Sequence, residues 1–257
     1  MCVACGHRTH ALAKDSDTER AAREAFLDEL VRILGEWHDD VLAALREGRL
    51  RLAADEAARR TVARVLTEYR DPIDTTTTTA WRDGAAAGRA ATVRRYDLDV
   101  PVGEDALADR VRRELQDYAL QQADQFTGRM VVDVAAALRD AHDAGIGVPE
   151  MERILAEEVF PDMTSYEAER IARTAGTGAA ARGAVSSIRD AGAPGKEWLA
   201  EDDSRTRAAH NAADGQVVPV GSKFTVGGQR LWWPGDPRGG PENVINCRCG
   251  VAPVWDL

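Results

Sequence analysis

The sequence predicts an α+β protein: a mainly helical N-terminal two-thirds with long amphipathic helices, followed by a small C-terminal α+β module containing a short β-hairpin. Two observations support this prediction. As far as about residue 192, apolar residues recur at three- and four-residue steps, the spacing of one helix face. Beyond residue 192, glycine and proline become frequent and short alternating runs occur, as in strands and turns.

Residues 1–75 form the first predicted helical region. One stripe of its main helix carries Leu27, Leu30, Leu34, Trp37, Val41 and Leu45. Ser16 or Asp17 can cap the start of this helix, because either side chain accepts from free first-turn amides. Pro72 and the threonines at 75–79 favour a linker or the start of a new helix, since proline lacks an amide donor and threonine is a poor helix former. We therefore expect a boundary near residue 75.

Residues 76–192 form the second helical region. Gly84 and Gly88, four apart among alanines, would let another helix approach closely. A long helix should end at Gly145, and a short helix should follow with Pro149 in its first turn. We expect the last helix to be capped by Ser165 and to stop near Gly192.

Residues 193–257 form the C-terminal module. FTVGGQRL predicts a hairpin, because Gly227 and Gly228 can adopt the positive φ angles of a tight turn. A short helix is expected over SRTRAAHNAA. The sequence shows no internal repeat of fixed period.

The formal net charge is -10, so the molecule as a whole has no general attraction for nucleic acid. Any DNA contact would be local, and the nearest thing to a basic face comprises Arg82, Arg89, Arg94 and Arg95. These arginines are interpreted either as a solvated helix face or as a phosphate-binding surface. No run of about 18 apolar residues suggests a membrane span, and the first residues lack the features of a secretory signal. We expect folding in a reducing cytoplasm, where closely spaced cysteines are free thiols or metal ligands.

The four cysteines form two close pairs. Cys247 and Cys249 could converge with His210 on zinc, which binds both residue types, or the two cysteines could be small buried hydrophobic residues in a compact module. Cys2 and Cys5 have the commoner CxxC spacing, with His7 and His10 nearby, but lie at a chain end without a core. A site shared between both pairs would supply four thiolates to zinc.

Enzyme chemistry is the weaker interpretation. His210 could serve as base to a Cys247 or Cys249 nucleophile, but no glycine-rich turn surrounds either cysteine. Asp202, Asp203, Asp214 and Asp236 could hold a hard cation or could be a helix cap and a solvated charge cluster. No catalytic residue is assigned on this basis.

The C-terminal residues resemble the Mu F-like family of phage minor head proteins, also called the phage head morphogenesis domain. The resemblance rests on the order and spacing of Trp198, Asp203, Arg207, His210, Asp214, Gly215, Gln216, Pro234, Gly235, Asp236, Asn246, Cys247, Arg248 and Cys249. It extends upstream to the segment AERIARTAGTGAAARGA, where Ala175 stands at the position of the glutamate usual in the family. The resemblance is strongest over residues 165–250 and gives nothing for residues 1–75.

The resemblance implies a minor capsid protein of a tailed phage or prophage that acts in head morphogenesis. Its expected location is the virion, in the head interior or at the portal vertex, after assembly in the bacterial host cytoplasm. The implied partners are the portal protein, with the major capsid protein, a scaffold or packaged DNA as further candidates and no membrane. The alternative is a metal- or thiol-dependent enzyme, a nuclease or transferase, built on His210, Asp214, Cys247 and Cys249.

Overall fold

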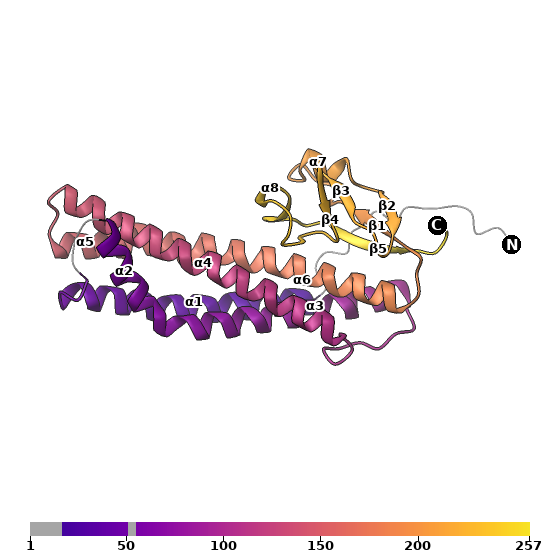
Figure 1. The fold of residues 1–257 in the computed structure, drawn as a ribbon, viewed down its shortest axis with the longest axis horizontal. Helices are drawn as coiled ribbons and strands as arrows, with labels where there is room; N and C mark the ends of the chain where they lie inside the picture. The colour runs from indigo at the N-terminus through magenta and orange to yellow at the C-terminus, as the bar shows by residue number, and fades with distance from the viewer. Residues whose placement is uncertain (1–16, 51–54) are drawn as a thin grey trace. The chain divides into compact units, whose positions relative to one another are not determined.

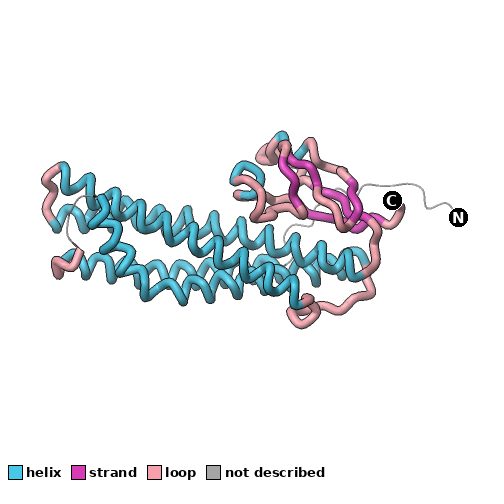
Figure 2. Tube along the Cα trace, in the orientation of Figure 1, coloured by secondary structure: helices cyan, strands magenta, loops and turns pink. Residues whose placement is uncertain are grey.

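The computed structural model describes residues 17–50 and 55–257. Within these ranges, long helices occupy most of the chain before residue 191 and all strands lie after it, which confirms the predicted α+β class (Figure 2). Packing divides the described residues into two compact units: residues 17–22, 82–111 and 174–257 form unit 1, and residues 23–50, 55–81 and 112–173 form unit 2. Several of the long helices contribute residues to both units.

Unit 2 is helical throughout its described part. Its elements are most of α1 (Asp17–Arg46), α2 (Asp55–Leu66), the start of α3 (Arg70–Tyr96), most of α4 (Asp109–Asp143) and α5 (Val148–Ile154), drawn in Figure 1. Trp37 and His38 on α1 pack against Phe160, and the His38 and Phe160 rings stack at 3.8 Å. The Trp81 indole donates to Gln122 at 3.0 Å, which joins α3 to α4. All residues of the predicted α1 stripe except Leu27 are buried, so the stripe forms part of the core of this unit.

The segment around Pro72 begins a helix and is not a linker. Helix α3 starts at Arg70, so Pro72 falls in the first turn, where its missing amide breaks no helical hydrogen bond. The following threonines are helical, and Thr77 Oγ1 donates to the Ile73 carbonyl at 2.7 Å. Of the two interpretations of this segment, the start of a helix is confirmed.

The predicted cap at Ser165 is wrong. The backbone is helical without interruption from Val148 to Asp190, through two π-helical stretches, Leu155–Val159 and Asp162–Glu167, into α6 (Ala168–Asp190). Ser165 lies inside this run and donates to the Pro161 carbonyl at 2.5 Å. Because Pro161 has no amide to donate, the local α-helical ladder is broken, and a π-helical stretch accommodates the break.

In unit 1, α3 and α6 pack with almost no side chain between them. A Cβ added at Gly84 would lie 2.9 Å from the Ala179 Cβ, and one at Gly88 would collide with the Ala180 backbone. On the opposite helix, a Cβ at Gly183 would collide with the Ala85 carbonyl. The close approach predicted from Gly84 and Gly88 is confirmed.

The C-terminal module of unit 1 has two small sheets. Strand β1 (Gly195–Leu199) is central between β2 (Val217–Pro219) and β5 (Gly250–Val254), and both pairings are antiparallel. Strands β3 (Phe224–Val226) and β4 (Gln229–Leu231) form the predicted hairpin, with Gly227 at φ 54° and Gly228 at φ 77°. Two single-turn helices, α7 (Ala208–Asn211) and α8 (Pro241–Val244), complete the module.

Within the described ranges, no helix combines the length and the hydrophobicity needed to cross a bilayer.

Candidate functional site

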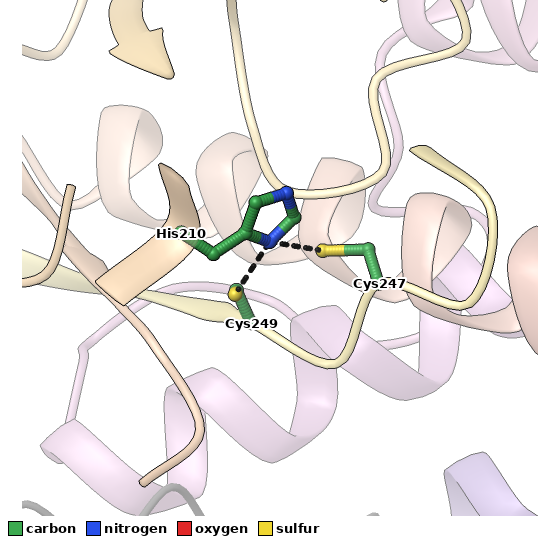
Figure 3. Close-up of side chains that lie close together, drawn as sticks. All are labelled: His210, Cys247 and Cys249. Carbon is green, nitrogen blue, oxygen red and sulfur yellow. Dashed lines mark hydrogen bonds between the residues drawn. The ribbon is translucent and has the colours of Figure 1, made fainter. Parts of the chain in front are cut away.

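A buried cluster of His210, Cys247 and Cys249 lies at the centre of the C-terminal module. Figure 3 shows the two sulfur atoms directed toward the same nitrogen of the imidazole ring. His210 comes from α7, whereas both cysteines come from the segment between α8 and β5. Chain segments about 40 residues apart are therefore brought together at one point.

The geometry of the cluster is compact. His210 Nδ1 lies 3.3 Å from Cys249 Sγ and 3.7 Å from Cys247 Sγ. The exposed fractions of His210, Cys247 and Cys249 are 2%, 1% and 5%. The cysteines precede β5, and this path lets a CxC spacing direct both sulfurs to one atom.

The two thiols have opposite pKa shifts because they interact with each other. The hydrogen bond with Cys249 lowers the pKa of Cys247, and backbone amides and Arg207 act in the same direction against burial. The same thiol–thiol hydrogen bond, together with burial, raises the pKa of Cys249. Both shifts thus arise chiefly from the contact between the two sulfurs.

Aromatic packing fixes the orientation of the imidazole. The ring of Trp198, on β1, lies at 89° to that of His210, with centroids 5.7 Å apart. Trp198 is fully buried and also contacts Phe224 edge-on at 5.3 Å. The second ring nitrogen of His210, Nε2, is buried without a hydrogen-bond partner among the described residues. The ring thus packs edge-on against its aromatic neighbour, and Nδ1 is the ring nitrogen that faces both sulfurs.

Arginines connect α7 to the cysteine-bearing segment on either side of the cluster. Arg248 Nη1 and Nη2 donate to the two carboxylate oxygens of Asp203 at 2.5 and 2.6 Å. This bidentate ion pair holds the pKa of the Asp203 carboxyl well below its usual range. Arg207 donates to the Ile245 carbonyl. An ion pair and a hydrogen bond thus flank the thiol–imidazole cluster.

The remaining polar signature residues stabilise turns and backbone. Asp214 accepts from the Ala200 amide at 2.9 Å, and the Gln216 side chain bonds both backbone groups of Thr225. Asp236 is fully buried and accepts from the Trp232 amide at 2.8 Å and from Arg238 Nε at 2.8 Å. Asn246 has a positive φ of 55°. Each of these residues shapes the module.

The module lies directly against α6. A Cβ added at Gly235 would come within 2.9 Å of the Gly178 Cα, so only glycine allows this approach. The Asn246 amide donates to Thr174 Oγ1 at 3.2 Å. Ala175, where the family usually has glutamate, is 1% exposed. A small apolar side chain fits this buried position.

One of the four arginines of the predicted basic face is buried. Arg89 is 1% exposed, and it donates to Asp190 at 2.7 Å and to the Pro101 carbonyl at 2.8 Å, so it is not available to bind DNA. Arg82 lies 3.7 Å from Glu104. Arg94 and Arg95 are exposed in the last turn of α3. The other predicted metal ligands, Cys2 and Cys5, lie outside the described residues.

Lys196 is a core residue that was not predicted from the sequence. This β1 lysine is fully buried, donates to the Trp232 carbonyl at 2.7 Å and lies 5.0 Å from the centre of the Phe224 ring. Burial, with the nearby Arg189 and Arg182, lowers its pKa to about 7. Its rarity is a usable signal, because lysine occurs only at positions 14, 196 and 223 in an arginine-rich chain.

The fold and site define a class: a long-helix protein ending in a small module that is closed by a histidine, two cysteines and an arginine–aspartate pair. The model of a family described as phage Mu protein F like protein matches residues 132–252. That region, which includes α6 and most of the module, belongs to the Mu F-like family, and this match supports a phage head-morphogenesis protein. No curated protein and no solved structure matches the chain.

Proposed function

We propose that this protein is a minor head component that binds the portal protein through its helical part during head assembly. The family match and the structural use of the signature residues support this function. In this proposal the C-terminal module is a rigid anchor, and the long helices of unit 2 present the partner-binding surface. The finished protein stays in the virion, at the portal vertex.

The observation that carries the proposal is that the charged signature side chains bond to other residues of the module. Asp203 pairs with Arg248, Arg207 reaches the Ile245 carbonyl, and Asp214 holds the Ala200 amide. A catalytic set instead directs its polar groups at a substrate. The family pattern therefore supports a conserved shape, as expected for an assembly component.

Exposed apolar residues on the helices support a protein partner. Val132, Val148 and Tyr166, all in unit 2, are 45%, 37% and 63% exposed. Large exposed apolar side chains are common singly, but aromatic residues are enriched at protein interfaces. Tyr166 also follows directly on Ser165 within a π-helical stretch, a feature frequent at functional positions.

The test is co-purification with the portal protein of the same phage, followed by electron microscopy of the heads. We expect the wild-type chain to co-purify and a Val132→Lys/Tyr166→Lys double variant to lose the portal while staying folded. Val102→Lys/Val217→Lys, at equally exposed positions of unit 1, is the matched control and should retain binding. Normal heads and normal infectivity after deletion of the gene would refute an assembly role.

The enzyme alternative makes a different prediction for the same cluster. Asp214 holds a backbone amide, and His210, Cys247 and Cys249 are buried. An enzyme carrying His210→Ala or Cys249→Ala would stay folded and enter heads but lose turnover. We expect instead that these variants lower the thermal stability of the module, measured by circular dichroism and limited proteolysis.

A further inference from the structure

We propose that His210 Nδ1 and the sulfur atoms of Cys247 and Cys249 bind a zinc ion that ties α7 to the C-terminal segment. Among the described histidine, cysteine and acidic side chains, these three form a group whose ligand atoms all lie within 4.8 Å of one another. All three are buried, and Figure 3 shows both sulfurs facing the same nitrogen.

The distances fit tetrahedral zinc. With Zn–N near 2.05 Å and Zn–S near 2.3 Å, a tetrahedral angle separates nitrogen and sulfur by about 3.6 Å. The two observed separations, 3.3 and 3.7 Å, lie on either side of this value. An ion placed between the three atoms would therefore bind them with only small side-chain movements.

The donor chemistry favours zinc over the hard divalent cations. Thiolate sulfur favours zinc over magnesium or calcium, which prefer oxygen ligands. Two thiolates and a neutral imidazole around Zn²⁺ have no net charge, so the loaded site can be buried without the cost of an isolated ion. On binding, each thiol loses its proton to solvent and the sulfur donates an electron pair to the metal.

Without a cation, the cluster is incompletely satisfied. One Nδ1 atom faces two sulfurs, at 3.3 and 3.7 Å, so a single imidazole N–H or lone pair cannot satisfy both of them. A divalent cation satisfies all three ligand atoms at once. No other described residue joins the group, so a water molecule would occupy the fourth position.

The ion would act as a structural crosslink. It would join positions 37 and 39 residues apart, between the flanking Asp203–Arg248 pair and the Arg207–Ile245 hydrogen bond. Closing a loop of this length restricts the unfolded chain, as a disulfide does, but in a reducing compartment. Burial of all three ligands, each at most 5% exposed, favours this role over catalysis.

The test is elemental analysis of the purified full chain, with cobalt substitution. We expect about one zinc per chain, and a cobalt form with tetrahedral d–d bands and a thiolate charge-transfer band. Removing the ion with a chelator should lower the melting temperature, and added zinc should restore it. A wild-type protein that holds no zinc, even after refolding with zinc present, would overturn the proposal without any variant being needed.

Variants then locate the site. Cys249→Ser and His210→Asn should each lose zinc and the cobalt spectrum. Two controls should keep both: Arg230→Gln, at an exposed position of the same module outside the cluster, and Cys2→Ser/Cys5→Ser, at positions outside the described residues. Loss of zinc in the Cys2→Ser/Cys5→Ser variant would show that the three-residue site is wrong.

Discussion

Arg248 lies between the two clustered cysteines and has a role of its own. Its guanidinium donates hydrogen bonds to both carboxylate oxygens of Asp203, which also accepts from the Arg205 amide at 2.9 Å. The planar fork of arginine matches a carboxylate in a way that an ammonium group does not. This pair fixes the loop before α7 to the segment before β5, so the arginine of the Cys-Arg-Cys motif helps to position both cysteines.

We predict that Arg248→Lys lowers the melting temperature of the module although it keeps the charge. Lysine supplies a point charge and loses one of the two parallel hydrogen bonds. Arg205→Lys is the matched control, because Arg205 bonds the same carboxylate from a more exposed position at 3.1 and 3.2 Å. Equal melting temperatures for wild type and Arg248→Lys, by circular dichroism, would contradict a bidentate role.

Lys196 makes stability depend on pH. Its folded pKa of about 7 lies below the ordinary value of 10.5, chiefly because burial disfavours the charged amine. Arg189 and Arg182 act in the same direction, and Asp236 opposes them. Between these two pH values the unfolded chain binds more protons at this residue than the folded chain does, so its contribution to stability rises with pH.

We predict that Lys196→Met removes this rise. The wild-type free energy of unfolding should gain at most about 1.4 kcal/mol per pH unit from this residue above pH 7. The variant lacks this gain. Its free energy of unfolding minus that of the wild type should therefore be more positive at pH 7 than at pH 9.5. Urea unfolding at both pH values measures the difference, and wild-type and variant curves that stay parallel across this range would refute the assignment.

At the scale of elements, the α3–α6 contact depends on glycine. Backbone or Cβ atoms of the facing helix lie directly opposite three glycines, Gly84, Gly88 and Gly183. The approach is so close that a methyl group has no space to enter. Glycine lowers helix stability relative to alanine because its backbone loses more conformational entropy on folding. Its benefit at these positions must therefore come from the close packing of the two helices.

We predict that Gly88→Ala and Gly183→Ala each lower the free energy of unfolding by at least about 1–3 kcal/mol, the usual cost of overpacking. Gly35→Ala and Gly128→Ala are matched controls, because a Cβ at either position meets nothing within 4 Å. Those controls should stabilise their helices by about 0.5–1 kcal/mol. Chemical denaturation of the four variants checks both signs, and a neutral Gly183→Ala would contradict the packing.

The sequence correctly predicted elements that neighbouring residues determine. It did not predict features that depend on contacts between residues far apart in the chain. The Gly227–Gly228 hairpin and the α1 stripe follow from turn geometry and helical period. The wrong cap at Ser165 arose because a serine before an apolar run favours a helix start, whereas the actual helix continues through Pro161. The convergence of His210 with both cysteines was predicted as a possibility, but the burial of Lys196 and Arg89 depends on contacts far along the chain.

At the scale of the whole molecule, charge limits contact with DNA. The net charge is -10, and within the described residues the candidate basic face is reduced by the burial of Arg89 and by the Arg82–Glu104 pair. Arg94 and Arg95 are the exposed members that this face retains, and Arg95 also lies 5.6 Å from the Tyr96 ring centre. Two cations on an acidic protein give little counterion release.

We predict that duplex DNA binds no more tightly than about 10⁻⁴ M near 0.15 M salt, the weak end of non-specific binding. Any binding at lower salt should weaken with a log–log slope of no more than about -2, since each phosphate contact contributes roughly -0.9. Fluorescence anisotropy with labelled duplex measures both, and Arg94→Ala/Arg95→Ala should abolish the residual signal. Arg110→Ala/Arg113→Ala, on α4, keeps the same net charge as that variant and is the control. Tighter binding, or equal loss in both variants, would mean that DNA contacts a different surface from the end of α3.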